Sequence, residues 1–118
     1  MYQVVLMPHP TSMLTTGFSE LLVLQLLAHR EMYGYELAKA ARVATREAFR
    51  LGEGVLYPLL HSLEVRQLLR SRRQLVNGRD RVYYALTSRG RKRLHTLSEH
   101  WQKLAAGVNA ARGGLVHV

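Results

Sequence analysis

The chain has no cysteine and no long apolar run, and each absence excludes a class of protein. Without cysteine there is neither a disulfide framework nor a thiolate metal site, as is common in a reducing cytoplasm. The longest apolar stretch, LLVLQLLA at 21–28, is less than half of a membrane span. No Lys or Arg precedes the short apolar run YQVVLM, unlike in a secretory signal. We therefore expect a cytoplasmic protein with no membrane partner.

Acidic residues are also scarce. The 8 Asp and Glu residues stand against 17 Lys and Arg residues, which gives a formal net charge of +9. From Arg66 onward there are twelve basic residues but only two acidic ones, Asp80 and Glu99. This distribution indicates an anionic partner such as nucleic acid.

Motifs for catalysis and metal binding are missing as well. The sequence has no close carboxylate pair, glycine-rich phosphate loop or nucleophile elbow. The histidines are scattered, and His95 and His100 are five residues apart, so they do not share a helix face as a metal pair would. We expect no enzyme, no cofactor and no metal site.

The 118 residues suffice for a single domain. Residues 1–14 contain Pro8 and Pro10 and show no helical period, which predicts a flexible N-terminal arm. A first helix is expected over 16–29, and it is apolar nearly all round. Either a partner subunit covers the apolar side of this helix that its own domain does not bury, or the helix lies at the centre of the core.

Two short helices follow. MYGYELAKAARV at 32–43 predicts a helix after Gly34, and GEGVLYPLLHSL at 52–63 predicts another that begins at Gly52 or Glu53. Pro58 crowds the carbonyl of residue 54, but that residue is glycine and the site is near the helix start. The second of these helices has a predicted buried face of Leu56, Leu59, Leu60 and Leu63, and a compact opposite face of Gly54, Tyr57, Pro58, His61 and Ser62. Short helices so closely spaced indicate a helix-turn-helix.

The period then changes to that of strands. LLRSRRQL and RVYYALT flank Asn77-Gly78, which is a strong turn signal, so we expect a β-hairpin. The hairpin is rich in arginine: Arg70, Arg72, Arg73, Arg79 and Arg81 lie on it or near its tip. A helix-turn-helix followed by a basic hairpin is a winged helix.

A long last helix is expected from Thr87 or Ser88 to Gly113-Gly114. Its apolar residues follow a heptad pattern, which predicts pairing with a helix of another subunit. The predicted fold is mainly α with a small β-hairpin. It consists of an arm (1–14), a winged helix-turn-helix domain (15–87), a C-terminal dimerisation helix (88–112) and a tail (113–118).

Three motifs in this order resemble the PadR-type winged-helix transcriptional regulators, within them the short members with a single C-terminal helix. The motifs are YGYELAKA at 33–40, GVLYPLLHSLE at 54–64 and RVYYALTSRG at 81–90, and the resemblance covers about residues 18–108. It implies a homodimer formed by the first and last helices, with the third helix reading DNA and the hairpin as its wing. Repressors are more common than activators in this family. By position, Tyr57 and Pro58 fall in the recognition helix, and Tyr83 and Tyr84 in the second wing strand.

Several positions depart from the family pattern. Gly52 stands where Ser or Asn usually caps the third helix, and Val55 where Thr is common. His61 and Ser62 replace a frequent Lys-Arg pair, and Gln67 replaces a glycine that commonly ends the helix. Direct base readout by this helix is therefore expected to be weaker, with more of the binding left to wing arginines.

The predicted contacts with double-stranded DNA combine the exposed helix face, the wing and the first motif. Arg79 and Arg81 are the strongest candidates because a hairpin tip can reach a minor groove or a phosphate that the helix cannot. In the alternative, Tyr57 packs on the second helix and the arginines are solvated charges on an edge hairpin. The predicted DNA-binding residues are Tyr35, Gly54, Tyr57, Pro58, His61, Ser62, Arg72, Arg73, Arg79, Arg81 and Tyr83.

The predicted dimer interface uses the apolar stripes of the first and last helices. Its residues are Leu21, Leu24, Leu94, Leu97, Trp101, Leu104 and Val108. Trp101 either packs in that interface or lines a pocket for a small hydrophobic or aromatic effector, as the corresponding aromatic does in some relatives.

These features favour a cytoplasmic, nucleoid-associated repressor that acts as a homodimer and is released by a ligand or partner. Two rivals stay open. One is an architectural protein that binds nucleic acid without sequence preference, which the net charge permits. The other is a protein-interaction module that has lost DNA binding, which the absence of a basic pair at 61 and 62 permits.

Overall fold

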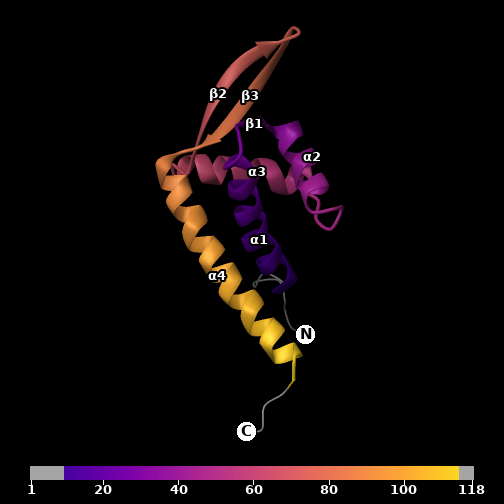
Figure 1. Ribbon diagram of the computed structural model, residues 1–118. Helices are drawn as coiled ribbons and strands as arrows, with labels where there is room; N and C mark the ends of the chain where they lie inside the picture. The colour runs from indigo at the N-terminus through magenta and orange to yellow at the C-terminus, as the bar shows by residue number, and fades with distance from the viewer. Residues whose placement is uncertain (1–9, 115–118) are drawn as a thin grey trace, which may run out of the picture.

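The computed structural model describes residues 10–114, so part of the expected arm, 1–9, and most of the expected tail, 115–118, lie outside the described residues. Within residues 10–114, four helices and a small sheet form one body from which a hairpin projects (Figure 1). In chain order the elements are α1 (Pro10–Leu27), β1 (Met32–Tyr33), α2 (Gly34–Ala44), α3 (Glu53–Val65), β2 (Leu69–Val76), β3 (Arg79–Leu86) and α4 (Ser88–Arg112).

Helix α1 begins earlier than its sequence pattern predicts. It already starts at Pro10, so residues 10–14 belong to a helix rather than to the expected arm, and it ends at Leu27 rather than at residue 29. Proline is well tolerated in a first turn, where the backbone N–H has no helical partner. The stretch after it lacks the apolar period that marks a helix in sequence, so the sequence pattern predicts a later start than the structure shows.

The core lies between α1, α2, α3 and the base of the hairpin. It consists largely of leucines, among them Leu37, Leu56, Leu60, Leu63 and Leu69. Helix α1 contributes Leu24, whose exposed fraction is 0% within the single subunit. The expectation that Leu24 belongs to a dimer interface is therefore wrong: for this side of α1 the central-core alternative holds.

Helix α3 has the predicted two faces. It begins at Glu53 behind Gly52 and contains Pro58, as expected. Leu56, Leu60 and Leu63 are buried and Leu59 is half-buried, whereas the opposite face is exposed except for the half-buried Ser62. The leucine spacing thus decided which side of α3 meets the core and which side faces solvent.

The expected hairpin is present, and a short third strand adds to it. The sheet order is β1-β3-β2, all antiparallel, with Tyr33 opposite Tyr83 and Arg72 also opposite Tyr83. Asn77 and Gly78 have φ values of 50° and 76°, which is the conformation of a tight type I′ turn. Strand β1 has only two residues, too few to leave a periodic signal in the sequence, and the sequence pattern did not predict it.

Helix α4 starts where predicted, and its first turn packs tightly on the loop after α3. The Gly90 N–H donates to the Thr87 hydroxyl at 2.9 Å, which caps the helix. A Cβ atom at Gly90 would lie 2.1 Å from the Leu68 carbonyl oxygen, so no side chain fits there. Beyond this anchor α4 runs beside α1, with the hairpin at the opposite end of the molecule (Figure 1).

Glu20 of α1 joins three helices. Both oxygens of its carboxylate accept from Arg66 at the end of α3, at 3.1 and 3.3 Å, and one also accepts from Arg93 Nε of α4 at 2.9 Å. Burial by itself would raise the pKa of Glu20, but the hydrogen bonds from the two arginines outweigh it and leave the pKa below its ordinary value. The carboxylate is therefore charged in the folded protein at neutral pH.

We expect Glu20→Gln to lower the free energy of unfolding by about 1–2 kcal/mol at pH 7, because two arginines lose a charged acceptor. A lowered folded-state pKa stabilises the fold above the unfolded-state pKa, and this contribution is lost as the pH falls through the folded-state value. The difference between wild type and variant should therefore shrink on acidification. Urea unfolding at several pH values measures it, with the exposed Glu99→Gln as the control. A constant difference down to acid pH would contradict the prediction.

Helix α3 ends in a Schellman motif at a residue that is not glycine. The Leu68 N–H donates to the Leu63 carbonyl and the Gln67 N–H to the Glu64 carbonyl, both at 2.9 Å. Gln67 has a φ of 63°, in the left-handed region that favours glycine. The departure from the family pattern seen in the sequence thus places a strained residue at the helix end.

Gln67→Gly is expected to stabilise the protein by about 1 kcal/mol, because it relieves the left-handed conformation. The Gln67 side chain accepts only from the exposed Arg89, so little is lost with it. The same exchange at Gln102, within α4, should instead destabilise by a similar amount because glycine is a poor helix former. Thermal unfolding of both variants checks the opposite signs, and a destabilised Gln67→Gly variant would refute the argument.

Candidate nucleic-acid interface

The exposed face of α3 is compact and carries no positive charge. Gly54, Tyr57, Pro58 and His61 are exposed on it, as the sequence predicts. Helix α3 contains no Lys or Arg, and its two charged residues are Glu53 and Glu64. Its side chains can therefore offer a hydroxyl and an imidazole to a partner, but any attraction for an anion has to come from neighbouring elements.

Tyr57 packs on the start of α2. A Cβ atom at Gly34 would lie 2.5 Å from the Tyr57 hydroxyl oxygen and 2.9 Å from its ring, so Gly34 leaves the space that the tyrosine occupies. The ring nevertheless remains 46% exposed. The alternative of packing on the second helix is thus correct, and an edge of Tyr57 is still free to contact a ligand.

Two open hollows flank this part of α2. One, of about 410 Å³, is lined by Lys39, Arg42, Arg50 and the residues that lead into α3. The other, of about 450 Å³, lies between Tyr33 and the wing residues 79–81. The exposed Tyr35 lines both. The two hollows thus meet at Tyr35, and both are lined by more cations than acids, Asp80 being the acid in the second one. We call the surface from the beginning of α3, across Tyr35, to the wing residues 79–81 the basic track.

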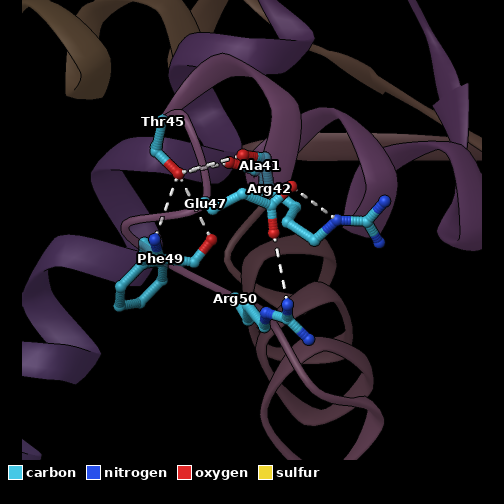
Figure 2. A network of polar contacts seen from close by, with 6 residues as sticks. All are labelled: Ala41, Arg42, Thr45, Glu47, Phe49 and Arg50. Carbon is cyan, nitrogen blue, oxygen red and sulfur yellow. Dashed lines mark hydrogen bonds and ion pairs between the residues drawn. The ribbon is translucent and has the colours of Figure 1, made fainter.

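The loop between α2 and α3 holds one end of the basic track in place (Figure 2). Glu47 accepts from Arg42 Nε at 3.0 Å and from Arg50 Nη2 at 3.2 Å. The Thr45 hydroxyl donates to the Ala41 carbonyl at 2.7 Å and accepts from the Phe49 N–H at 3.1 Å. The loop is thus fixed by its own hydrogen bonds, and the two arginines are aligned beside the first turn of α3.

Arginines and tyrosines alternate on the face of the sheet that carries Tyr33. The Arg81 guanidinium lies 4.4 Å from the centre of the Tyr33 ring, and the Arg72 guanidinium lies 4.7 Å from that of Tyr83. Tyr33 also contacts Tyr83 edge-on at 5.4 Å and stacks with Tyr35 at 6.4 Å. These contacts orient the arginines away from the core, and they bring the predicted residues Tyr35, Arg72, Arg81 and Tyr83 onto one face.

The wing arginines differ in how far acids neutralise them. Arg72 donates to both oxygens of Glu31, which lowers the pKa of Glu31 and raises that of Arg72, and Arg73 pairs with Asp80. Among the described side chains, neither Arg79 nor Arg81 forms a salt bridge. The unpaired charge is therefore greatest next to the turn of the hairpin.

A second surface, apolar in character, lies along α1 and α4. Two neighbouring hollows of about 270 and 230 Å³ are both lined by Phe18, Leu21 and Trp101, and one of them also by Leu97 and Leu104. Leu94 is half-buried against the core, whereas Leu104 is 65% exposed and Val108 is exposed farther along α4. Apart from Leu24, which belongs to the core, the residues predicted for an interface between subunits lie on one side of these two helices.

Comparison with known proteins identifies the family. The model of the transcriptional regulator PadR-like family matches residues 23–96, well over half of the chain. The chain belongs to the PadR-like family. Its fold is the winged helix of these DNA-binding transcriptional regulators, which are not enzymes.

Individual relatives agree with this assignment. Transcriptional regulator Rv3488 of Mycobacterium tuberculosis is 38% identical over 95 residues, covering 80% of this chain and 83% of that protein. A solved transcriptional regulator from Clostridium thermocellum superposes with a TM-score of 0.76 at 28% identity, over 82% of this chain and 95% of that one. A PadR family regulator from Eggerthella lenta superposes with a TM-score of 0.71 at 30% identity, over 86% of this chain and 87% of that one.

Nothing among the described residues of this PadR-like chain points to a metal site or a membrane span. No three His, Asp or Glu side chains gather there in a way that could hold a metal ion. No described helix has both the length and the apolar character needed to cross a bilayer.

Three cationic residues of the basic track were not predicted from the sequence. Lys39 belongs to the YGYELAKA motif, and Arg42 and Arg50 stand near or in the loop before α3. A helical projection of α2 would have placed Lys39 on its outer side, since Leu37 and Ala41 face the core. The grouping with Arg50 depends on the loop conformation, for which the sequence carries no periodic signal.

The pairing of the wing arginines predicts unequal effects on DNA binding. Arg79→Ala with Arg81→Ala should weaken binding to every duplex and reduce the log–log salt slope by about two, because each unpaired cation replaces a counterion at a phosphate. Arg72→Ala with Arg73→Ala changes the net charge equally but should reduce the slope less, because carboxylates already neutralise these residues. Fluorescence anisotropy at several salt concentrations compares the two variants. Equal slopes would show that the salt bridges of Arg72 and Arg73 do not reduce the contribution of these arginines to DNA binding.

Proposed function

We propose that this PadR-like protein is a cytoplasmic, nucleoid-associated repressor that binds double-stranded DNA as a homodimer. The observation that carries the proposal is the basic track, which places cations beside a recognition helix that has no basic side chain of its own. Helix α3 would enter the major groove with Tyr57 and His61, while Gly54 and Pro58 allow a close approach. Arg79 and Arg81 would contact the flanking backbone or minor groove, and Tyr35 and Lys39 the phosphates between.

The apolar surface of α1 and α4 supports the dimer. Trp101, Leu104 and Val108 are all exposed in the single subunit, and large apolar side chains grouped on one surface usually mark an interface. A second copy packed there would leave both wings free, because the hairpin lies at the other end of the molecule (Figure 1). Two copies of α3 would then meet successive major grooves, about 34 Å apart.

The hollows beside Trp101 suggest how the repressor is released. Their lining is mainly apolar and includes the aromatic rings of Phe18 and Trp101, which suits a small flat hydrophobic effector. An effector that binds best to a dimer with another spacing of the two α3 helices would lower the affinity for the operator. Its site would then be part of the dimer interface.

The two rivals make different predictions about specificity. An architectural protein would bind unrelated duplexes equally, and the lack of basic side chains on α3 is compatible with this. An interaction module without DNA binding would leave the basic track unused. The unpaired Arg79 and Arg81 of the wing lie on the same track as Lys39, Arg42 and Arg50, of which the two arginines share the single carboxylate of Glu47. This excess of positive charge favours a DNA ligand over this second rival.

The test is fluorescence anisotropy with a duplex from the region upstream of the gene, beside a scrambled duplex of equal composition. We expect at least a hundredfold preference for the upstream duplex and a steep fall in affinity with salt. In sedimentation runs the wild type should be a dimer, whereas Leu104→Glu, which buries a charge in the proposed interface, should be a monomer with much weaker binding.

Weak, equal and salt-sensitive binding to both duplexes would support the architectural rival for these sequences. A complete lack of binding by a folded wild-type dimer would support the interaction module. A Leu104→Glu variant that remains dimeric would reject the proposed interface.

A further inference from the structure

Three aromatic rings connect the loop before α3 with the helices that carry the apolar surface. Phe49, in the loop, meets Phe18 of α1 edge-on, with ring centres 4.8 Å apart and an interplanar angle of 77°. Phe18 in turn lies 5.9 Å from Trp101 of α4, at an angle of 60°. The contacts form a chain from the surface of α1 and α4 to the helix-turn-helix, where Phe49 also packs against the leucine core.

Phe49 is also tied to the start of the recognition helix. Its N–H donates to the Thr45 hydroxyl, which holds the loop against the end of α2 (Figure 2). Two residues later Leu51 is buried, and α3 begins at Glu53. A shift of the Phe49 ring therefore moves backbone that lies a few residues from the first turn of α3 and beside the guanidinium of Arg50.

We propose that Phe49 is a positioning residue for the recognition helix and that, through Phe18, it makes the placement of α3 depend on the packing around Trp101. The inference rests on the proposed DNA binding and adds the residues through which the two surfaces of the molecule communicate. A change at Trp101, whether from a second subunit or from a small molecule, shifts Phe18 and with it the loop. Because coupling is reciprocal, DNA bound to α3 also changes the surroundings of Trp101.

The geometry distinguishes this contact from general core packing. Phe18 and Phe49 are only half-buried, and edge-to-face rings prefer a defined mutual orientation, which a leucine at either position would not reproduce. Phe18 is the one aromatic residue of α1. Phe49→Leu thus keeps an apolar side chain but removes the directional contact.

The experiment uses Trp101, the single tryptophan of the chain, as the reporter. We expect a saturating operator duplex to shift the Trp101 emission of the wild type, although Trp101 lies on α4 and outside the basic track. Phe49→Leu should bind the duplex about three- to tenfold more weakly and lose the emission shift, while Phe49→Tyr retains the ring and both properties. Val23→Ala, a core truncation in α1, controls for a general loss of stability and should keep the emission shift.

Hydrogen exchange of the free protein supplies a measurement that does not require DNA. Phe18→Leu should raise the exchange of residues 49–56 more than Val23→Ala does. Wild-type affinity together with an unchanged emission shift in Phe49→Leu would overturn the inference. If the wild type bound no duplex, the proposed function would fail first, and unchanged exchange at 49–56 in Phe18→Leu would then overturn the positioning role as well.

Discussion

The Glu20 carboxylate holds three helices at one point, and the positions of both functional surfaces depend on it. Its two arginine partners come from the end of α3 and from α4. On the same helix Val23 and Leu24 are completely buried in the core. The end of α3 and the first part of α4 are therefore both bound to the same residue of α1. These contacts help to fix the apolar surface relative to the basic track, which the proposed repressor, with a set spacing between two α3 helices, would require.

The few acidic residues of the chain determine which of its arginines are neutralised and which remain unpaired. Glu31 and Asp80 each take up one wing arginine, and Glu47 aligns two others beside α3. Arg79 and Arg81, near the tip of the hairpin, have no carboxylate partner among the side chains that the structure describes. A net charge of +9 would attract any polyanion, but this distribution places unpaired cations where a duplex can meet α3 and the wing together. The arrangement compensates for a recognition helix that has no basic side chain of its own.

Most of the fold could be predicted because its signals are local. Leucine spacing defines the buried face of α3, Asn77-Gly78 sets the turn, and Thr87 with the heptad pattern gives the extent of α4. Local signals failed where they are weak. Strand β1 is two residues long, and the early part of α1 has no apolar period, so the sequence pattern missed the first and placed the second too late.

The candidate site was predictable only in part. The exposed face of α3 and the arginines of the hairpin follow from periodicity and composition. The position of Lys39 and Arg50 beside that face could not be predicted, because it depends on the conformation of the loop between α2 and α3. Nor does the sequence reveal that Arg72 and Arg73 are paired, since Glu31 is far from Arg72 along the chain and only the folding of β1 against β3 brings them together.

The sequence by itself thus determined the secondary elements other than β1 and the start of α1, the family and the excess of positive charge, because each depends on residues that are close along the chain or on composition. The tertiary structure alone decided that Leu24 is core, that Gly34 makes room for Tyr57, and that Phe49 reaches Trp101 through Phe18. The physical reason is the same in each case. The sequence pattern around an apolar or aromatic residue predicts only whether that residue is buried or exposed. Which residue it contacts depends on close packing between segments that meet when the chain folds.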